Sequence, residues 1–199
     1  MSVSPDYFQQ LFNGSDDPWS FRTRWYEKRK RELMLARRLR QRYQRVYEPA
    51  CANGEFSALL AERSESLLCQ DIIDKAVTLA RRRLSHLPHV RVEQARIPED
   101  WPDGTFDLIV LSEVGYFLDA RAWRQVIERT LLSLDAQGGV LACHWLHPFE
   151  GCSQDGRDVH AALAQNLQLH RLVRHEEADF LLEYWSRNPA SIDLAETCE

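Results

Sequence analysis

Two groups of residues, about twenty positions apart, have the chemistry needed to bind a nucleoside. The first is the turn Glu48-Pro49-Ala50-Cys51-Ala52-Asn53-Gly54, where small side chains allow a ligand close to the backbone and Gly54 can adopt a conformation forbidden to larger residues. The second is Asp71, whose carboxylate can accept hydrogen bonds from both hydroxyls of a ribose. A helix starting at Glu55 would present its free N–H groups to the same ligand. The alternative is an ordinary strand-to-helix turn followed by an aspartate that caps a helix.

Two further side chains could act on a substrate. Glu113 could accept a proton or orient an ammonium group, and His144 titrates near neutrality and could act as a base. We predict that Glu113 and His144 together position and deprotonate an acceptor. The side chains expected to contact that acceptor are Tyr116, Trp145 and His147. For each of these residues, the alternative is a hydrogen bond that only holds a loop in place.

A group of potential metal ligands lies in the same part of the chain. Its members are Cys143, His144, His147, Cys152 and His160. Their spacing differs from that of the common structural zinc sites, and Cys143 falls in an expected buried strand whose side chains alternate in direction. We therefore predict no metal.

The residues around these groups predict alternating strands and helices. Strands are expected over residues 45–50, 66–70, 90–94, 106–112, 140–145, 169–173 and 180–185, and helices over 55–63, 74–84, 120–133 and 158–165. Residues 106–112 are almost continuously apolar, which is typical of a strand buried on both faces. The short polar connection 175–179 permits an antiparallel hairpin but no parallel crossover. The sequence thus predicts an α/β fold with a mostly parallel seven-stranded sheet and a terminal antiparallel strand.

The N-terminal part of the chain lies ahead of this alternation and is expected to be helical. One face of a first helix carries Tyr7, Phe8, Leu11 and Phe12. Residues 13–18 have the composition of a loop, and a second helix is expected from Trp19 to Leu39. We predict an N-terminal helical segment (1–44), an α/β domain (45–188) and a flexible tail (189–199).

Composition and length indicate one ordinary globular domain of 199 residues. No apolar run approaches the roughly 20 residues of a membrane helix, and the first residues lack the basic and apolar regions of a secretory signal. The five cysteines are odd in number and form no C-x-x-C pair, so free thiols in a reducing compartment are expected. A cytoplasmic location follows as the prediction.

Charge is distributed unevenly along the chain. Basic residues are dense between Arg22 and Arg45, although the net charge is −5. Such a stretch could contact nucleic acid or phosphate, or it could be the solvated face of a helix. Because the chain as a whole is acidic, it has no general electrostatic attraction to nucleic acid, and we predict no such partner.

Several segments in register resemble class I S-adenosylmethionine-dependent methyltransferases, which have a Rossmann-like fold. Phe106-Asp107-Leu108-Ile109 resembles their F-D-L-I/V strand, residues 134–139 resemble their L-x-P-G-G turn, and residues 48–54 resemble their E-x-G-C-G-x-G turn. The departures are Ala50 and Ala52 in place of glycines, Gln137 in place of proline, and Arg96 where an acid often holds the adenine. The resemblance implies S-adenosylmethionine as cofactor. It assigns cofactor contacts to Trp19, Tyr26, Glu48, Ala50, Cys51, Ala52, Gly54, Asp71, Ile72, Arg96, Ile97, Ser112 and Glu113.

A closer resemblance covers nearly the whole chain. Asp16-Asp17-Pro18-Trp19, Arg24-Trp25-Tyr26-Glu27 and Leu111-Ser112-Glu113-Val114-Gly115-Tyr116-Phe117-Leu118 resemble the nodulation protein S (NodS-like) family of methyltransferases. That family is best known for N-methylation of the free amine on a deacetylated chitooligosaccharide. The resemblance implies that the N-terminal segment is a lid over the cofactor, with Trp19 and Tyr26 close to the sulfonium, whose charge suits aromatic faces.

The predicted function is methyl transfer to a small-molecule acceptor, such as this oligosaccharide amine. One alternative is a nucleic-acid methyltransferase, although Ser112-Glu113-Val114-Gly115 stands where those enzymes carry N/D-P-P-Y/F. Another is a catalytically silent binding protein on the same fold, which Ala50, Ala52 and Arg96 make worth considering. The choice between N- and O-methylation and the oligomeric state stay open.

Overall fold

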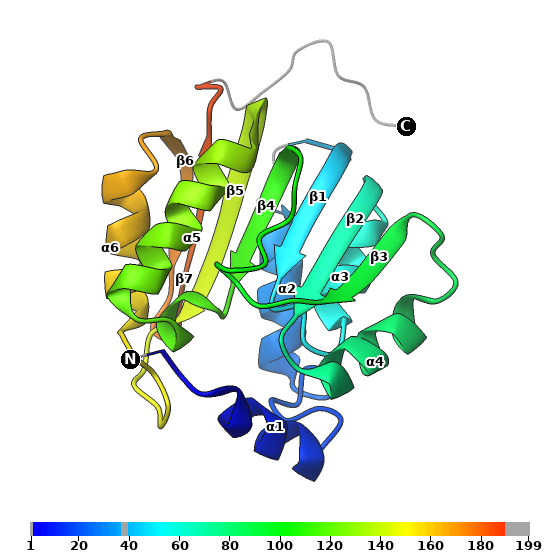
Figure 1. Cartoon of the computed structure of the whole chain (residues 1–199). Coiled ribbons are helices and arrows are strands. Elements are labelled where there is room, and N and C mark those ends of the chain that lie inside the picture. The colour runs from blue at the N-terminus through cyan, green and yellow to red at the C-terminus, as the bar shows by residue number, and fades with distance from the viewer. Residues whose placement is uncertain (1, 37–39, 190–199) are drawn as a thin grey trace.

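The computed structural model describes residues 2–36 and 40–189, and its framework is one seven-stranded sheet with helices on both faces (Figure 1). The strands are β1 (Tyr43–Pro49), β2 (Ser64–Asp71), β3 (Val90–Gln94), β4 (Phe106–Ser112), β5 (Leu134–Trp145), β6 (His170–Glu176) and β7 (Phe180–Ser186). The helices are α1 (Pro5–Gly14), α2 (Trp25–Ala36), α3 (Glu55–Ala61), α4 (Asp74–Leu84), α5 (Ala120–Ser133) and α6 (Gly156–Asn166), with a short 3-10 helix, η1 (Gly115–Phe117).

The strands follow the order β3-β2-β1-β4-β5-β7-β6. Neighbouring strands from β1 to β5 pair in parallel, whereas β7 is antiparallel to both β5 and β6. This confirms the predicted mostly parallel sheet with an antiparallel final strand. The structure adds that β7 enters between β5 and β6, so β6 forms the edge. The strand order reverses between β1 and β4, where sheets of this kind bind ligands beyond their carboxyl ends.

Strand β4 lies in the interior of the sheet and is covered on both faces. Its residues from Phe106 to Leu111 are all buried. Leu108 and Val110 belong to the core cluster that includes residues of α2, α3 and α4, while Ile109 and Leu111 belong to the cluster with residues of α5 and α6. A strand covered on both faces must be apolar at successive positions rather than at alternate ones.

Most predicted bounds differ by up to three residues, but two elements differ by six residues at their start. Helix α2 begins at Trp25 instead of Trp19, because the carboxylate of Asp17 accepts hydrogen bonds from the backbone N–H groups of Phe21 and Arg22 and holds this stretch in turns. Strand β5 begins at Leu134, six residues before the predicted start. Most of the predicted tail and residues 37–39 at the end of the predicted second helix lie outside the described residues.

Helix α1 crosses the carboxyl ends of the strands (Figure 1). The backbone N–H of Val3 donates to the carbonyl of Phe117 at 2.8 Å, and the hydroxyl of Tyr7 donates to the carbonyl of Glu150 at 3.1 Å. The Lys75 ammonium lies 2.9 Å from the carboxylate of Asp16. These contacts attach the N-terminal segment to η1, to the loop after β5 and to α4. Among the described residues, no helix has the length and apolar character needed to span a membrane.

The contact between β5 and β7 requires a residue without a side chain at position 139. A Cβ atom on Gly139 would lie 2.0 Å from the hydroxyl oxygen of Tyr184, which is buried in the core. We expect Gly139→Ala to lower the free energy of unfolding by roughly 1–3 kcal/mol through overpacking, measured by urea denaturation. Gly14→Ala is the matched control, because its Cβ would meet nothing within 4 Å. Equal stability of the two variants would contradict this account.

Candidate functional site

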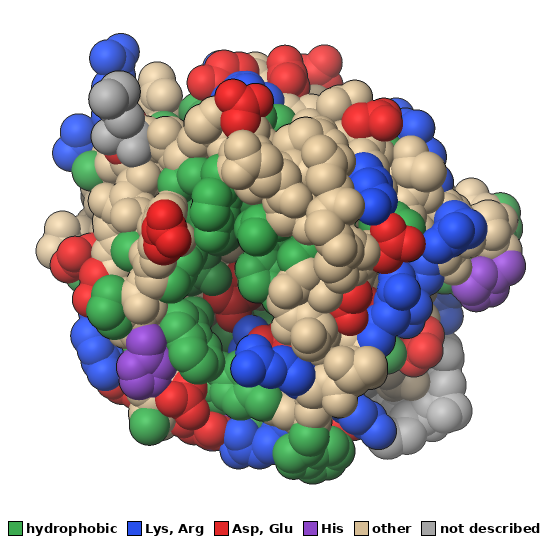
Figure 2. Space-filling view, turned by 90° about the horizontal axis from the view of Figure 1, so that it is seen from below, with side chains coloured by type: hydrophobic (Ala, Val, Ile, Leu, Met, Phe, Trp, Pro, Cys, Tyr) green, Lys and Arg blue, Asp and Glu red, His purple; other side chains and the backbone are tan. Residues whose placement is uncertain are grey.

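A cavity of about 470 Å³ opens at the carboxyl ends of the strands, beneath α1. Figure 2 views this face and shows hydrophobic side chains around a hollow, with acidic and basic groups visible within it. The cavity brings together most of the residues predicted for the site: Trp19, Tyr26, Ala50, Ala52, Asp71, Ile72, Arg96, Ile97, Glu113, Tyr116 and Trp145. Residues from opposite ends of the sequence therefore share one space.

The turn after β1 has a left-handed backbone at three positions. The φ angles are 57° at Ala50, 50° at Ala52 and 78° at Gly54. The turn is held to β2 by a hydrogen bond from the N–H of Cys51 to the carbonyl of Gln70, at 3.0 Å. The two alanines thus hold a conformation that glycine would adopt more easily, with φ values that are unusual for residues carrying a side chain.

Gly54 lies outside the cavity wall, and its role in the described structure is in packing. A Cβ at this position would meet the backbone of Ala80 on α4 at 3.2 Å. The glycine therefore permits close approach of α3 and α4. Its predicted contact with the cofactor stays a prediction, and a backbone contact is the only kind it could make.

Asp71 ends β2 and joins the turn to the cavity. Its Oδ2 accepts from the N–H of Ala52 at 2.9 Å, and its Oδ1 accepts from the N–H of Ile73 at 3.0 Å. Burial raises the pKa of Asp71, while these backbone donors favour its ionised form. Each carboxylate oxygen keeps acceptor capacity, so Asp71 can hold the turn and still receive two hydroxyl groups.

Glu48, Cys51 and Ser112 lie around a smaller cavity of about 60 Å³, whose wall also includes Ala52 and Glu113. The hydroxyl of Ser57 donates to Glu48 Oε2 at 2.5 Å. Burial raises the pKa of Glu48 to about 7, in spite of this hydrogen bond. Glu48 is therefore a buried carboxyl that titrates near neutral pH.

Glu113 lies at the end of β4 with a φ of 54° and three hydrogen-bond donors around it. Its Oε1 lies 2.6 Å from the ammonium of Lys30, and its Oε2 accepts from the backbone N–H of Trp145 at 3.1 Å and from the hydroxyl of Tyr116. The cavity exposes part of the carboxylate, because its side chain is 20% accessible. Glu113 is thus fixed in position at the cavity wall.

Lys30 on α2 is the main functional candidate that sequence reasoning missed. Its ammonium is buried between Glu113 and Glu27, 3.1 Å from Glu27 Oε2. Burial alone would lower the pKa of Lys30, but the two carboxylates outweigh it and raise that pKa above its usual value. The signal was the Glu27–Lys30 spacing of three, followed by Met34 on the same face of the helix. The surrounding basic stretch favoured a solvated helix instead.

Tyr26 and Trp145 form an aromatic wall beside this ion pair. Their ring centroids are 5.5 Å apart at 87°, and the Lys30 ammonium lies 5.2 Å from the Tyr26 ring centroid. The hydroxyl of Tyr26 is buried and has no hydrogen-bond partner in the described part of the chain. Burial raises the pKa of Tyr26, so the hydroxyl is a donor that a ligand carboxylate in the cavity could engage.

The N-terminal segment contributes the rest of the wall. Trp19 packs against Phe12 and Phe21, with ring centroids 5.7 and 5.5 Å away. Phe12, Phe21 and the cation of Arg24 also line the cavity, and none of the three was predicted to do so. The sequence placed Phe12 on one face of the first helix, but no local pattern distinguishes a face that lines a cavity from one that packs in a core.

His144 does not reach the cavity. Its side chain is fully buried on the opposite face of β5, where its ring lies 6.0 Å from that of Trp123 and its Nδ1 lies 3.1 Å from His160 Nε2. Burial lowers the pKa of His144 well below its usual value, and His160 and Lys30 act in the same direction. The geometry argues against the predicted role as a base, because a neutral imidazole behind the strand cannot touch an acceptor.

His147 also lies outside this cavity. Its Nε2 is 2.7 Å from the carboxylate of Asp179, and it lines a separate cavity of about 170 Å³ that Tyr116 and Trp145 also border. Of the predicted metal candidates, only His144 and His160 contact each other through their rings. In the described ranges, no three His, Cys, Asp or Glu side chains are grouped as a metal site requires.

This sheet order, with a tight turn after β1 and an aspartate ending β2, is that of class I S-adenosylmethionine-dependent methyltransferases. The chain belongs to the nodulation protein S (NodS) family, which matches residues 5–143. Nodulation protein S of Rhizobium tropici is 31% identical over 136 residues, covering 66% of this chain and 57% of that protein. The relative from Bradyrhizobium diazoefficiens is covered over 61% of its length, so the matches span less than two thirds of these relatives.

Solved structures agree with this family. A Pseudomonas syringae protein provisionally assigned as a methyltransferase is 51% identical, with a TM-score of 0.75 over 82% of this chain and 100% of that chain. The N-methyltransferase NodS of Bradyrhizobium japonicum WM9, in complex with S-adenosyl-L-homocysteine, has a TM-score of 0.79 at 24% identity. That comparison covers 92% of this chain and 98% of the other, and shows the shared fold.

S-adenosylmethionine is the cofactor of this class, and the cavity has the groups that such a ligand needs. Asp71 offers two acceptors to a ribose, and the unpartnered hydroxyl of Tyr26 offers a donor to a carboxylate. Trp19 contributes an aromatic ring to the wall, which suits a sulfonium. Arg96 and Ile97 line the part of the cavity that is expected to hold the adenine. The residues present therefore fit the cofactor.

The geometry of Asp71 predicts how the cofactor is held. Asp71→Ala should weaken binding of S-adenosylhomocysteine at least tenfold in calorimetry, because two charge-assisted hydrogen bonds to the ribose are lost. Asp71→Asn keeps one carbonyl acceptor for the N–H of Ala52 and separates ribose loss from damage to the turn. Ala50→Gly should retain affinity, because glycine adopts the left-handed φ at that position without strain. Unchanged affinity in Asp71→Ala would place the ribose elsewhere.

The pKa of Glu48 predicts a pH-dependent stability. Between 4.5 and about 7 this carboxyl is ionised in the unfolded chain but protonated in the folded protein. The folded state then binds the extra proton, so stability falls as pH rises through this window, by up to roughly 3 kcal/mol, and is constant above it. Glu48→Gln should remove this slope in urea denaturation measured from pH 5 to 8. An identical slope in wild type and variant would show that other groups cause it.

Proposed function

We propose that this protein transfers the methyl group of S-adenosylmethionine to an amine of a small molecule, with the free amine of a deacetylated chitooligosaccharide as the leading acceptor. The family and the fold support methyl transfer. The solved relative from Bradyrhizobium japonicum is an N-methyltransferase, which favours nitrogen as the atom that is methylated. The observation that carries the choice of an amine lies in this chain, at the end of β4.

That observation is an excess of negative charge around a buried cation. Two carboxylates, Glu27 and Glu113, surround the single ammonium of Lys30, so the cluster has a net charge of −1 when all three are ionised. Such a cluster attracts an ammonium group to the cavity and orients it toward Glu113. A developing oxyanion would be disfavoured there by the same charge.

Among the described residues, none that lines the cavity is a strong base. Lys30 keeps its proton because the carboxylates raise its pKa, and both oxygens of Glu113 already accept hydrogen bonds. The described residues that line the cavity include no histidine. An amine can lose its proton to solvent or to a weak base before it reacts, whereas a hydroxyl group needs a stronger base.

The chain's own residues then account for the rest of the reaction. The bound cofactor supplies an electrophilic methyl group on a sulfonium. Glu113 would orient the acceptor nitrogen at the cavity wall, and release of the amine proton to solvent would leave the nitrogen lone pair free to react. Trp19, Tyr26 and Trp145 exclude water and present aromatic faces to positive charge.

The N-terminal segment serves as the lid in this proposal. Its helix α1 places Tyr7 and Phe8 in the cavity wall, and the following loop adds Trp19 and Arg24. The N-terminal segment and Glu113 therefore border the same cavity. The four described cysteines are free thiols, which supports a reducing, cytoplasmic location.

A nucleic-acid acceptor has less support. Much of the basic stretch is engaged within the protein: Arg29 pairs with Glu177 at 2.6 Å, Lys30 is buried, and Arg31 donates to the carbonyl of Phe21. These groups are not displayed for phosphates. Salt-dependent binding of RNA or DNA would nevertheless show directly that this alternative holds.

The test compares deacetylated chitotetraose with its fully N-acetylated counterpart, following formation of S-adenosylhomocysteine and the mass of the product. Only the free amine should be methylated. Glu113→Gln should lower kcat/KM for this probe at least tenfold, because the charge that orients the ammonium is lost, while calorimetric affinity for S-adenosylhomocysteine stays within threefold. Methylation of both sugars would show O-methylation and contradict the proposal. A Glu113→Gln variant with unchanged turnover would place the acceptor elsewhere.

A further inference from the structure

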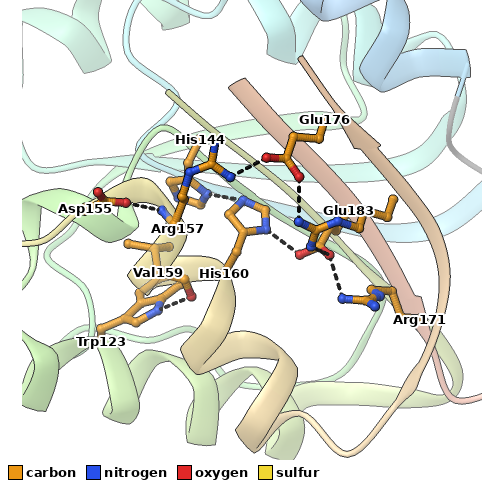
Figure 3. A network of polar contacts seen from close by, with 10 residues as sticks. Trp123, His144, Asp155, Arg157, Val159, His160, Arg171, Glu176 and Glu183 are labelled. Carbon is orange, nitrogen blue, oxygen red and sulfur yellow. Dashed lines mark hydrogen bonds and ion pairs between the residues drawn. The ribbon is translucent and has the colours of Figure 1, made fainter. Parts of the chain in front are cut away.

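A chain of polar contacts joins His144 on β5, His160 on α6 and Glu183 on β7, and continues to Arg171 of β6 (Figure 3). The backbone N–H of Gly115 donates to His144 Nε2 at 3.1 Å, and His144 Nδ1 lies 3.1 Å from His160 Nε2. His160 Nδ1 in turn lies 2.7 Å from Glu183 Oε2. The chain thus links η1, β5, α6 and β7, and every side chain in it is buried.

The far end of the chain reaches solvent through two arginines of β6. Arg171 and Arg174 donate to Glu183 Oε1 at 3.0 and 2.9 Å, and their side chains are 44% and 42% exposed. Burial opposes ionisation of Glu183, but His160 and Arg174 hold its pKa below the usual value. Glu183 therefore supplies a fixed negative charge inside the protein.

The hydrogen bonds fix the tautomer of both rings. Because His144 Nε2 accepts from a backbone N–H, the proton of this neutral imidazole must be on Nδ1. His144 then donates to His160 Nε2, which leaves the His160 proton on Nδ1, directed at the carboxylate of Glu183. Each link has one donor and one acceptor, and the anion at the end sets the direction of all of them.

This arrangement cannot act as a proton route to the acceptor. It ends on the N–H of Gly115, a backbone amide that does not titrate, and His144 is separated from the cavity by its own strand. What the chain can do is hold Gly115. That residue lies between Glu113 and Tyr116, the two residues whose carboxylate and hydroxyl meet at the cavity wall.

The packing around Gly115 supports a positional role. A Cβ on Gly115 would lie 2.4 Å from Val159 and 3.1 Å from His144 Nε2, so η1 is seated against α6 and the imidazole without slack. The indole N–H of Trp123 donates to the carbonyl of Val159 at 3.1 Å and fixes the same contact from α5. An apolar side chain at position 144 would leave the buried N–H of Gly115 without an acceptor.

We propose that His144, His160 and Glu183 are positioning residues for methyl transfer, which hold η1 so that Glu113 and Tyr116 meet the acceptor amine in one geometry. The role rests on the proposed function for its catalytic consequence, but not for its structural one. The cofactor turn at Ala50–Gly54 and Asp71 is built from other contacts. Loss of the chain should therefore impair acceptor turnover without impairing cofactor binding.

The first test reads the structure without turnover, by NMR of the full chain labelled with ¹⁵N. The ring nitrogens of His144 and His160 should both report the neutral form protonated at Nδ1. His144→Leu and Glu183→Gln should accelerate hydrogen exchange of the Gly115 amide at least tenfold, while exchange of the Ala52 amide, bonded to Asp71, stays unchanged. Tautomers protonated at Nε2, or unchanged Gly115 exchange in both variants, would overturn the proposal.

The second test measures kinetics with deacetylated chitotetraose at saturating S-adenosylmethionine. His144→Leu and Glu183→Gln should lower kcat at least tenfold with S-adenosylhomocysteine affinity within threefold, and His144→Gln, which restores an acceptor near the Nε2 position, should recover most of the rate. Ser133→Ala is the matched control, because it removes the partly buried hydrogen bond that Trp101 donates to Ser133 on the same side of the sheet, away from the cavity. A parallel loss of turnover and cofactor affinity, or an equal loss of turnover in Ser133→Ala, would overturn the proposal.

The two tests remain informative if one variant does not fold or if the proposed acceptor is wrong. If His144→Leu does not fold, Glu183→Gln and His144→Gln carry the comparison alone, and a Glu183→Gln variant with wild-type exchange and turnover then overturns the proposal. If the wild type does not methylate the sugar, the proposed acceptor is wrong. The tautomers and the Gly115 exchange then decide whether the chain positions η1.

Discussion

The structure depends on neutralising one buried ammonium group. Lys30 is 4% exposed and lies between Glu27 on its own helix and Glu113 at the end of β4. Removing one partner of a buried ion pair leaves an uncompensated charge and costs roughly 3–5 kcal/mol. Helix α2 can therefore leave the end of the sheet only by separating this pair. This ion pair therefore fixes the position of α2 relative to the sheet. It also fixes the left-handed backbone of Glu113 and the cavity wall that these residues form.

The sequence predicted the parts of this protein that depend on local patterns. Strand β4 was predicted because burial on both faces requires an uninterrupted apolar run, and the place of Asp71 was predicted because strand length and helix length fix its distance from the turn. Lys30 was missed because its partner Glu113 lies 83 residues away, and a lysine in a basic stretch is normally solvated. His144 was placed at the correct strand end but on the wrong face. Neighbouring side chains of a strand point in opposite directions, so an uncertainty of one position reverses the face.

The turn after β1 keeps the backbone conformation of its motif although two of the usual glycines are replaced. The turn has alanine at two positions where related methyltransferases usually have glycine, yet Ala50 and Ala52 both have positive φ angles. A left-handed alanine costs roughly 1–2 kcal/mol. The hydrogen bonds from Cys51 to the carbonyl of Gln70 and from Ala52 to Asp71 offset this cost. The carboxylate that is predicted to bind the ribose, Asp71, therefore also holds this turn in its shape.

The place of β7 in the sheet has a consequence for folding during synthesis. Strand β7 is the last described strand in the chain, yet it lies between β5 and β6 and pairs with both. Until residues 180–186 have left the ribosome, β5 has a free edge, and β6 has no partner in the sheet. An exposed edge of this kind can pair with another chain. Chains halted before this point would therefore be prone to aggregate, and Glu183 would be the last of the buried polar groups in its network to arrive.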